Sequence, residues 1–421
     1  MQRIVYAEWG WPEYREVFSC LLRRRQDQGD KLGEMLANFE KFFPGSALLP
    51  VNRGRFALKL ALRVFAELEP HKTEVVYPAY ICSSVIEMIE EAGLVPVPAD
   101  VGPDLNLDVA NAERAVTKKT LAVVAVHMYG CPAPAAALEQ FCKERRIFLV
   151  DDAATLAGIT ADRGRMLGGF GDAGLISFTA SKSIVAGGFN AGGLLLVNNP
   201  ALLAPMQRAW AALPEPRFGV GDFLTFLRDQ QLEPYAQAAI YYYGAVQRRL
   251  FGRSNRSRAC PPRRMANINA FVIIRQLRSL DQRIAGRIRI VESFGRRIAA
   301  IPGVCFPQYQ PGRYLTRIVL LLPEGTEVSS IRAALWRRGV GTRRGYQLDF
   351  RHGSTFPAAA QIAPRLLEVP SHSRQREAEV ERICAALAAV VNPRQAKYPS
   401  TKSAEGQARV VEGERRSRPV A

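Results

Sequence analysis

Residues 147–152 read Ile-Phe-Leu-Val-Asp-Asp, an apolar run that leads directly into two carboxylates. A helical pattern, Ala135 to Arg145, comes just before this run. A short run that is apolar at every position predicts a strand buried on both faces, and helices between such strands indicate a parallel sheet. The stretch therefore predicts an α/β fold in which two acidic residues follow the end of a buried strand.

The same alternation of strands and helices extends to both sides of this stretch. Further short apolar strands are expected at 74–77, 94–97, 120–127, 174–178 and 193–197. Together they predict a large domain at 46–262 with a mostly parallel central sheet covered by helices. A smaller α+β domain is expected at 263–393, with one long helix through Leu277 and Leu280 and a strand from Arg317 to Leu322.

Three segments fall outside this alternation. Residues 1–45 predict a helical arm, because their apolar side chains recur at helical spacing. Residues 203–260 predict a helical insertion rich in aromatic and basic side chains, which fits an interfacial membrane helix or, as the favoured reading, a core or subunit interface. Residues 394–421 are polar and basic without periodicity, and they predict a disordered tail.

Composition narrows the class of protein. A hydrophobic content of 48% in 421 residues supports a large core, and a net charge of +18 favours anionic partners. The basic residues are dispersed and accompany no nucleic-acid-binding signature, so we expect an enzyme with a basic surface, no nucleic-acid partner, and peripheral membrane contact as an open alternative.

Cysteine and histidine usage predicts neither a disulfide framework nor a metal site. The seven cysteines are far apart, and the four histidines lack paired spacing. The N-terminus has no apolar signal segment, and no apolar run reaches the length of a membrane span, so the expected location is the cytoplasm.

Two residues, Asp152 and Lys182, are candidates for a ligand-binding or catalytic site. Asp152 follows the buried strand, and ligands of open α/β sheets bind beyond the carboxyl ends of strands; a helix cap for the segment from Ala153 is an equal alternative. Lys182 follows another apolar strand and is flanked by small residues and by the glycine-rich run 187–193. Missing side chains permit close backbone approach to a ligand, which favours a ligand site over an ordinary surface lysine.

Several motifs then occur in a specific order. They are Arg53-Gly54-Arg55-Phe56-Ala57-Leu58, Tyr77-Pro78-Ala79-Tyr80, Val126-His127-Met128-Tyr129-Gly130, Val150-Asp151-Asp152-Ala153-Ala154, Ser177-Phe178-Thr179-Ala180-Ser181-Lys182 and Val369-Pro370-Ser371-His372. From about residue 38 to 391, the ordered set resembles the DegT/StrS-like sugar aminotransferases, which are fold-type-I enzymes dependent on pyridoxal 5′-phosphate. No single motif carries this resemblance alone.

The resemblance implies roles for particular side chains. Lys182 would form the Schiff base with the cofactor aldehyde and later carry a proton between substrate and cofactor. Asp152 would keep the pyridine nitrogen protonated, which makes the ring an electron sink. Ser177 would donate to the cofactor phosphate, and Gly54 and Arg55 would open a helix whose N-terminus binds the same phosphate, unless Arg55 simply faces solvent.

The chain also departs from the family pattern. Cys82 stands where the family has an aromatic that stacks on the pyridine ring, so either Tyr80 substitutes for it or the stacking is lost. Thr155 replaces a glutamine that contacts the cofactor's phenolic oxygen. The family's Asn-x-Arg-Met appears as Pro262-Arg263-Arg264-Met265, so Arg264 survives without the asparagine that reaches the neighbouring subunit.

Two histidines are further candidates. His127 either lies near the cofactor or is a satisfied core histidine, and the two readings are equally good. His372 either reaches a substrate pocket or caps the region that follows.

The resemblance implies a homodimeric aminotransferase. It would move an amino group from an amino acid, with glutamate favoured, to a keto sugar, with a nucleotide-linked one favoured, in polysaccharide or secondary-metabolite synthesis. Two alternatives stay open: an enzyme with the same cofactor acting on another carbonyl compound, and a non-catalytic relative used for binding or scaffolding. The family's dehydratase branch has histidine in place of the lysine, so Lys182 argues against that branch.

Overall fold

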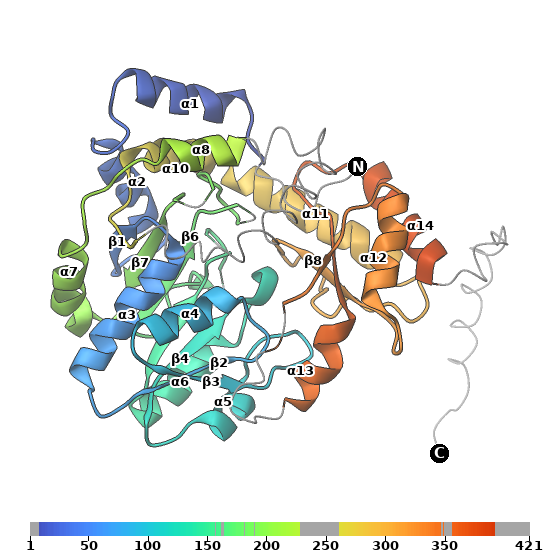
Figure 1. Cartoon of the computed structure of the whole chain (residues 1–421), viewed down its shortest axis with the longest axis horizontal. Helices are drawn as coiled ribbons and strands as arrows, with labels where there is room; N and C mark the ends of the chain where they lie inside the picture. The colour runs from blue at the N-terminus through green and yellow to red at the C-terminus, as the bar shows by residue number, and fades with distance from the viewer. Residues whose placement is uncertain are drawn as a thin grey trace, which may run out of the picture.

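The structure is a computed structural model of the 421-residue chain. It describes residues 8–155, 157–160, 164–180, 182–188, 190–227, 261–346, 348 and 356–391. Two sheets of unequal size organise this part of the chain, and helices surround both of them (Figure 1).

The larger sheet has seven strands in the order β1-β7-β6-β5-β4-β2-β3. In chain order they are β1 (Ala47–Val51), β2 (Glu74–Pro78), β3 (Val95–Ala99), β4 (Thr120–Val126), β5 (Phe148–Asp152), β6 (Ala173–Ser177) and β7 (Gly193–Val197). β7 is antiparallel to both of its neighbours, whereas the pairs from β6 across to β3 are parallel. Each strand predicted for this region is present, and β1 adds an edge strand that the apolar pattern did not reveal.

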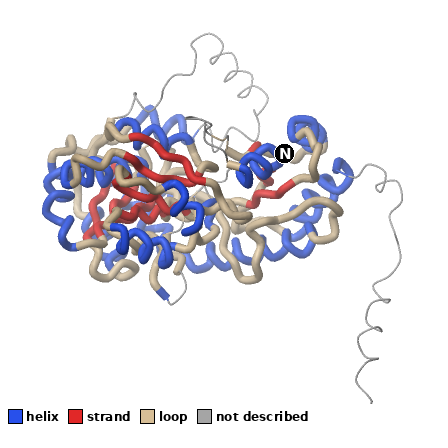
Figure 2. Tube along the Cα trace, turned by 90° about the horizontal axis from the view of Figure 1, so that it is seen from below, coloured by secondary structure: helices blue, strands red, loops and turns tan. Residues whose placement is uncertain are grey.

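Helices cover both faces of this sheet, and Figure 2 shows the strands enclosed between them. The helices that follow or connect its strands are α3 (Gly54–Leu68), α4 (Ser83–Glu91), α5 (Val109–Ala115), α6 (Ala135–Arg145) and α7 (Leu203–Ala211). Two short 3₁₀ turns, η1 (Met128–Gly130) and η3 (Pro200–Leu202), lie among the connections.

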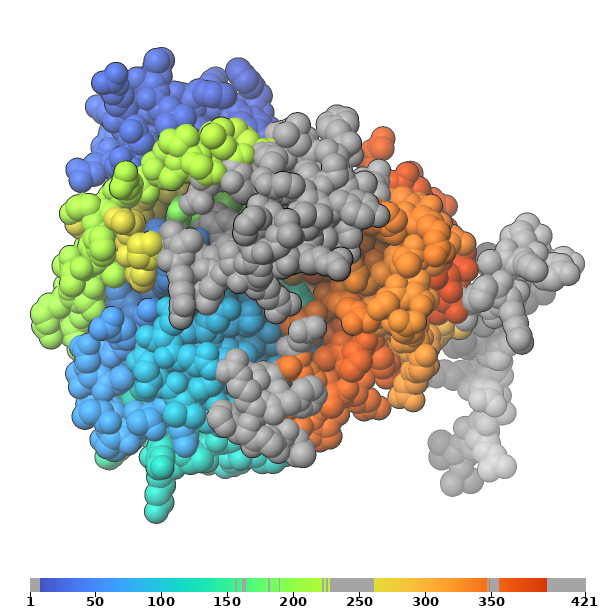
Figure 3. Space-filling view, viewed as in Figure 1, coloured from blue at the N-terminus to red at the C-terminus, as the bar shows by residue number. Residues whose placement is uncertain are grey.

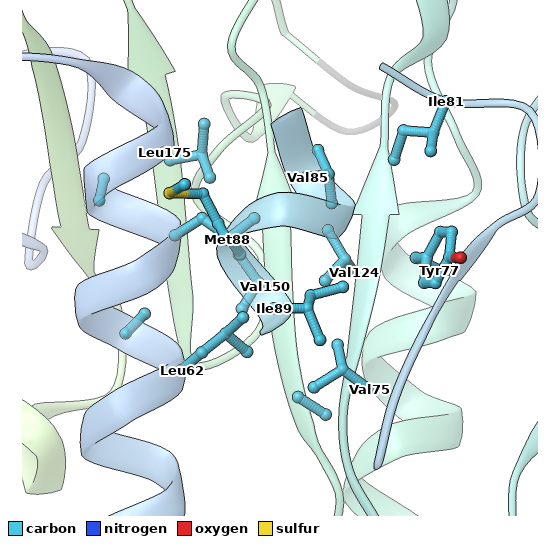
Figure 4. Close-up of a cluster of buried hydrophobic side chains, with 14 of the residues drawn as sticks. Leu62, Val75, Tyr77, Ile81, Val85, Met88, Ile89, Val124, Val150 and Leu175 are labelled. Carbon is cyan, nitrogen blue, oxygen red and sulfur yellow. The ribbon is translucent and has the colours of Figure 1, made fainter. Parts of the chain in front are cut away.

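The two faces of the sheet bury different apolar clusters. On one face, Leu62 of α3 and Met88 of α4 pack on Val75, Val124 and Val150 (Figure 4). On the other face, α5 and α6 cover the alternate residues of β2, β4 and β5. Burial on both faces explains why these strands are apolar at successive positions.

The N-terminal arm packs against the body of the molecule. It contains α1 (Trp11–Leu22) and α2 (Lys31–Glu40), and both contact α10 (Asn267–Leu277), with α8 (Val220–Leu227) nearby in Figure 1. Val17 and Cys20 of α1 and Met35 and Phe39 of α2 are buried in one apolar cluster. The helical arm predicted for residues 1–45 is therefore helical over α1 and α2 and is built into a hydrophobic core.

The smaller sheet has three antiparallel strands in the order β8-β10-β9. Its elements and neighbours are α11 (Leu280–Ile298), β8 (Ile318–Leu321), α12 (Val328–Arg337), β9 (Arg343–Arg344), α13 (Pro357–Ile362), η6 (Ala363–Arg365), β10 (Leu366–Val369) and α14 (Glu377–Val391). α11, α12 and α14 share an apolar core with this sheet. The domain boundaries at 46–262 and 263–393 stay predictions.

The single long helix predicted through Leu277 and Leu280 is wrong. The chain leaves helical geometry at Ser279, between α10 and α11, and the Ser279 hydroxyl donates to the Gln276 carbonyl oxygen at 3.3 Å. A serine hydroxyl competes in this way for carbonyl groups that a continuous helix would use.

Parts of two other predictions fall beyond what the structure describes. Within 203–260, α7 and α8 are helical as predicted, whereas 228–260 lie outside the described residues. The tail predicted at 394–421 also lies outside them. Among the helices that are described, none is both long and apolar enough to cross a bilayer.

Candidate active site

A cavity of 380 Å³ opens at the carboxyl ends of the parallel strands. Residues that follow β2, β4, β5 and β6 contribute to its wall, together with the first turn of α3 and residues from the smaller sheet. Predicted residues that line it are Gly54, Arg55, Cys82, His127, Asp152, Thr155, Ser177 and Lys182. The carboxyl ends of parallel strands share one edge of a sheet, so motifs far apart in the sequence meet there.

The first turn of α3 forms one end of the cavity. Gly54 is the first residue of the helix, and a Cβ atom there would lie 2.6 Å from the Ser177 Cβ. A Cβ at Gly193, on β7, would lie 2.4 Å from the Gly54 nitrogen. Both glycines are needed because the helix start touches β6 and β7 without room for a side chain.

This end of the cavity suits an anion. Backbone N–H groups in the first turn of a helix have no partner within the helix, and the helix dipole favours negative charge there. The Ser177 hydroxyl lies 3.2 Å from the Thr179 hydroxyl, so two side-chain donors stand beside those backbone groups. A phosphate is the ligand that such a set of donors binds best.

The two neighbouring aspartates have different partners. Asp151 is fully buried, and its carboxylate accepts the Gly168 N–H at 2.7 Å, the Phe170 N–H at 3.0 Å and a bond from His127. Asp152 lines the cavity and accepts the Ala154 N–H at 3.0 Å. Side chains of successive strand residues point to opposite faces, so only the second carboxylate reaches the cavity.

Asp152, which is buried, and Lys182, which is half-buried, both line the cavity. Burial lowers the pKa of Lys182, and the Asp152 carboxylate opposes that shift while Arg317 adds to it. Burial also raises the pKa of Asp152, against the Ala154 N–H and the Lys182 charge. Removal from water disfavours the charged form of each group, so Lys182 is closer to its free-amine, nucleophilic form than a surface lysine.

His127 combines the two readings left open by the sequence. The residue lines the cavity, but its side chain is fully buried: Nδ1 accepts the Ala133 N–H at 2.9 Å and Nε2 lies 2.7 Å from Asp151 Oδ1. Because Nδ1 is an acceptor, the ring proton belongs on Nε2 and is donated to Asp151. Both nitrogens are therefore used in the framework of the wall.

Three more predicted residues keep their place in the cavity wall. Cys82 is the N-cap residue of α4. The Thr155 hydroxyl donates to the His127 carbonyl oxygen at 3.4 Å. Arg55 lines the cavity but is also ion-paired with Glu87 of α4 at 3.4 Å, so its charge is shared between the site and the neighbouring helix.

Tyr80, nominated for the cofactor as a possible substitute for the missing stacking ring, does not line the cavity. It is fully buried, its hydroxyl lies 2.7 Å from the Tyr129 hydroxyl, and it accepts the Tyr346 N–H at 3.0 Å. The hydroxyl needs partners in the interior, and these hold the ring behind the wall.

Arg264 and His372 also lie away from this cavity. Arg264 is ion-paired with Glu215 and lies over the Trp210 ring, 5.4 Å from its centroid. His372 follows β10; burial lowers its pKa, which the nearby charge of Glu8 opposes. Both side chains serve the packing around them within this chain.

The opposite wall contains residues that the sequence did not nominate. Tyr129 and Tyr346 form a stacked pair with ring centroids 5.4 Å apart, and the Arg317 guanidinium lies 5.7 Å from the Tyr129 centroid. Arg317 also donates to Glu368 Oε2 at 3.2 Å. Burial raises the pKa of Tyr346 to about 12, so both rings enter the wall uncharged at neutral pH.

Only a weak signal in the sequence pointed to this wall. Tyr129 belongs to a motif that was recognised for His127, and Arg317 merely begins a predicted strand. Tyr129 has a φ of +57°, an uncommon backbone conformation for a non-glycine residue that no sequence pattern announces.

Comparison with known proteins identifies what the chain is similar to. Residues 13–388 match the model of the DegT/DnrJ/EryC1/StrS aminotransferase family. A GDP-perosamine synthase of Vibrio cholerae is 30% identical over 177 residues, which are 42% of this chain and 47% of that protein. A GDP-perosamine synthase of Caulobacter vibrioides is 26% identical over 373 residues, 85% of this chain and 90% of that protein.

A solved structure gives the same result for the fold. PseC of Helicobacter pylori, an aminotransferase involved in the biosynthesis of pseudoaminic acid, superposes with a TM-score of 0.75 at 16% identity, over 93% of this chain and 99% of that one. The resemblance and the fold class predicted from the sequence motifs are therefore confirmed.

Proposed function

The chain belongs to the DegT/DnrJ/EryC1/StrS aminotransferase family, and we propose that it transfers an amino group from an amino acid to a nucleotide-linked keto sugar, with pyridoxal 5′-phosphate as cofactor. One observation carries the proposal. A half-buried lysine and a buried carboxylate line one cavity with the glycine-opened start of a helix.

The residues of the cavity fit this cofactor. The first turn of α3, with Gly54 and the Ser177 hydroxyl, is suited to the phosphate, and the contact between Gly54 and Ser177 leaves no room for a side chain there. Asp152 offers a buried carboxylate for a ring nitrogen that must stay protonated, and Lys182 offers the amine. Cys82, Thr155 and His127 complete the wall around them.

When bound, the cofactor supplies an electron sink that stabilises negative charge on the substrate carbon. The chain's own residues do the rest. Lys182, with its pKa lowered by burial, would accept a proton from the substrate carbon and carry it to the cofactor. Asp152 would hold a proton on the ring nitrogen, and its burial strengthens its interaction with a nearby positive charge.

The keto-sugar substrate rests on the relatives and on charge. Both curated relatives described above are GDP-perosamine synthases, and both are named for a nucleotide-linked sugar. In this chain, Arg53, Arg55 and Arg317 line the cavity together with Lys182, so basic side chains outnumber the acidic Asp152 there. An excess of positive charge in a cleft favours substrates that carry a diphosphate or a carboxylate.

The assembly and location of the enzyme are further parts of the proposal. We propose a cytoplasmic homodimer, in which Arg264, away from its own cavity, lies near a partner's site. Glutamate is the proposed donor, because the resemblance implies it. A different carbonyl acceptor is the alternative activity.

Absorbance spectroscopy tests the cofactor proposal. Wild-type protein with added pyridoxal 5′-phosphate should develop a visible band that glutamate bleaches, and Lys182→Ala should develop none. Lys118→Ala, which changes an exposed lysine, is the matched control and should behave as wild type. A wild-type protein without the band, or a Lys182→Ala variant that keeps it, overturns the proposal and favours a non-catalytic relative.

Product analysis tests the acceptor. With glutamate and a panel of nucleotide-linked keto sugars, mass spectrometry should find a product in which an amine replaces the carbonyl. Turnover of another carbonyl compound, with none of the sugars accepted, would establish the alternative activity.

A further inference from the structure

Glu8 and Trp9, near the start of the described residues, are buried against segments that lie far from them in the sequence. Glu8 and Trp9 are 3% and 8% exposed, although α1 begins only at Trp11. Trp9 donates its indole N–H to the Val185 carbonyl oxygen at 2.7 Å. Val185 lies three residues after Lys182, so the arm bonds directly to the segment that carries the lysine.

The segment after Lys182 is short of regular structure and depends on such bonds. The Val185 N–H donates to Gln276 Oε1 of α10 at 2.7 Å, and the Ala186 N–H donates to the Phe178 carbonyl oxygen at 2.8 Å. The Ser183 hydroxyl accepts the Ala157 N–H at 3.0 Å. Trp9 therefore satisfies a buried carbonyl that belongs to neither a helix nor a strand.

Glu8 ties the same arm to the other side of the molecule. Its carboxylate is ion-paired with Arg283 at 3.3 Å and Arg287 at 3.1 Å, both on α11, and it accepts the Ser373 N–H at 3.0 Å and the Ser373 hydroxyl. Its φ of +57° is uncommon for a residue with a side chain. Such a conformation persists where the surrounding contacts determine it.

The contacts of Glu8 continue to the opposite wall of the cavity. Arg287 donates to the Thr316 carbonyl oxygen at 2.7 Å, and Thr316 donates its N–H and its hydroxyl to the Tyr129 carbonyl oxygen, each at 2.9 Å. Thr316 is followed by Arg317, and Tyr129 and Arg317 both line the cavity. One continuous set of hydrogen bonds thus joins Glu8 to Tyr129 and to the residue before Arg317.

The Trp9 ring reaches the cavity wall by a second route. It packs edge-on against Phe226 of α8, with ring centroids 4.8 Å apart, and Phe226 lines the cavity. Figure 3 shows α1 and α8 together along the same margin of the molecule.

We propose that Glu8 and Trp9 form an N-terminal clasp that positions Lys182, by bonding the segment after the lysine to α11 and to the opposite wall of the cavity. The proposal rests on the proposed function, since positioning matters only if Lys182 receives the cofactor. The clasp residues do not line the cavity; they act through Val185 and Phe226 on one side and through Arg287 on the other.

Charge keeps the clasp closed at neutral pH. Burial raises the pKa of Glu8, but the two arginines and Ser373 outweigh it and bring the pKa to about 2. The carboxylate is therefore ionised at neutral pH, where it pairs with both arginines.

Trp9→Phe tests the clasp, because phenylalanine keeps a ring against Phe226 and loses the N–H donor. Trp11→Phe changes an exposed tryptophan, 71% accessible, and is the matched control. Glu8→Gln, paired with the exposed Glu40→Gln as control, removes the charge at the other end of the clasp.

The first readout needs no cofactor. Hydrogen exchange of the Val185 amide, measured in the apo protein, should be about three- to tenfold faster in Trp9→Phe than in wild type, as expected for one lost hydrogen bond. Unchanged exchange in both clasp variants overturns the clasp, whatever the wild-type protein does with pyridoxal 5′-phosphate.

The second readout follows the lysine. The pH midpoint of the visible band should shift in both clasp variants, and cofactor binding should weaken about three- to tenfold. The Val185 amide could exchange faster while the pH midpoint of the band and the cofactor affinity stay unchanged. The clasp would then be a structural contact only, and the proposal that it positions Lys182 would be overturned. A wild-type protein without a band instead refutes the proposed function. Should Trp9→Phe fail to fold, Glu8→Gln carries both measurements.

Discussion

The two walls of the cavity are built in different ways. The sheet wall takes Gly54, Asp152, Ser177 and Lys182 from the ends of parallel strands and the start of one helix. The opposite wall takes Tyr129 from a turn with unusual backbone geometry, Arg317 from the residue before β8 and Tyr346 from the segment after β9.

The two walls are therefore expected to differ in role: one takes part in the reaction, and the other binds the substrate. Groups whose protonation matters stand on the sheet wall, where short motifs hold them at the carboxyl ends of strands. The opposite wall offers two stacked rings and a guanidinium, which suit contacts with a bound substrate. We expect changes on the sheet wall to impair turnover and changes on the opposite wall to impair substrate binding.

Asp152→Asn should have the largest effect. An amide cannot hold the ring nitrogen protonated, so turnover should fall by roughly 10²–10⁴-fold, the range typical of a positioned acid–base group. The visible band should still form because Lys182 is unchanged. Steady-state kinetics with a saturating amino donor measure the loss, and a variant within a few-fold of wild type would remove Asp152 from the mechanism.

Asp151→Asn should act on stability. The Asp151 carboxylate accepts two backbone N–H groups and the His127 proton, and an amide leaves one of these donors without its acceptor. Unfolding free energy should fall by about 1–3 kcal/mol, as urea denaturation would show. The folded fraction should turn over at nearly the wild-type rate, in contrast to Asp152→Asn.

Arg317→Gln should raise the KM for the anionic substrate by about tenfold with little change in kcat, which is the loss expected for one charge-assisted contact. The change also leaves Glu368 buried beside a neutral residue. The double variant Arg317→Gln/Glu368→Gln therefore serves as the control. A lower kcat with unchanged KM in both variants would place Arg317 with the chemistry and break the division between the walls.

Tyr80→Phe should have the smallest effect. It removes the hydroxyl that bonds Tyr129 and the Tyr346 N–H, which should cost about 0.5–1.5 kcal/mol of unfolding free energy. The visible band and its cofactor affinity should not change, because Tyr80 lies behind the wall. A shifted absorbance maximum would return Tyr80 to the role of a ring that touches the cofactor.

Much of the sheet wall could be predicted from the sequence. The apolar runs before Asp152 and Ser177 predict strands, the glycines around Lys182 predict close approach, and strand ends meet at one edge of a parallel sheet. The same reasoning failed at Tyr80. A tyrosine in the right motif was given a cofactor contact, whereas its hydroxyl found partners in the interior.

The opposite wall and the clasp could not be predicted in this way. Arg317 and Tyr346 follow Tyr129 by long stretches of chain, and Trp9 lies 176 positions from Val185. No local pattern specifies which of many buried donors will meet a given carbonyl, because that depends on how the helices of the arm pack on α10.

By itself, the sequence determined the family, the mostly parallel sheet and the residues nominated for the cofactor, because strand ends and helix starts are local features written in short motifs. Only the tertiary structure decided which tyrosines line the cavity and what holds the lysine segment. Those outcomes depend on contacts between distant segments, where burial requires each polar group to find a partner.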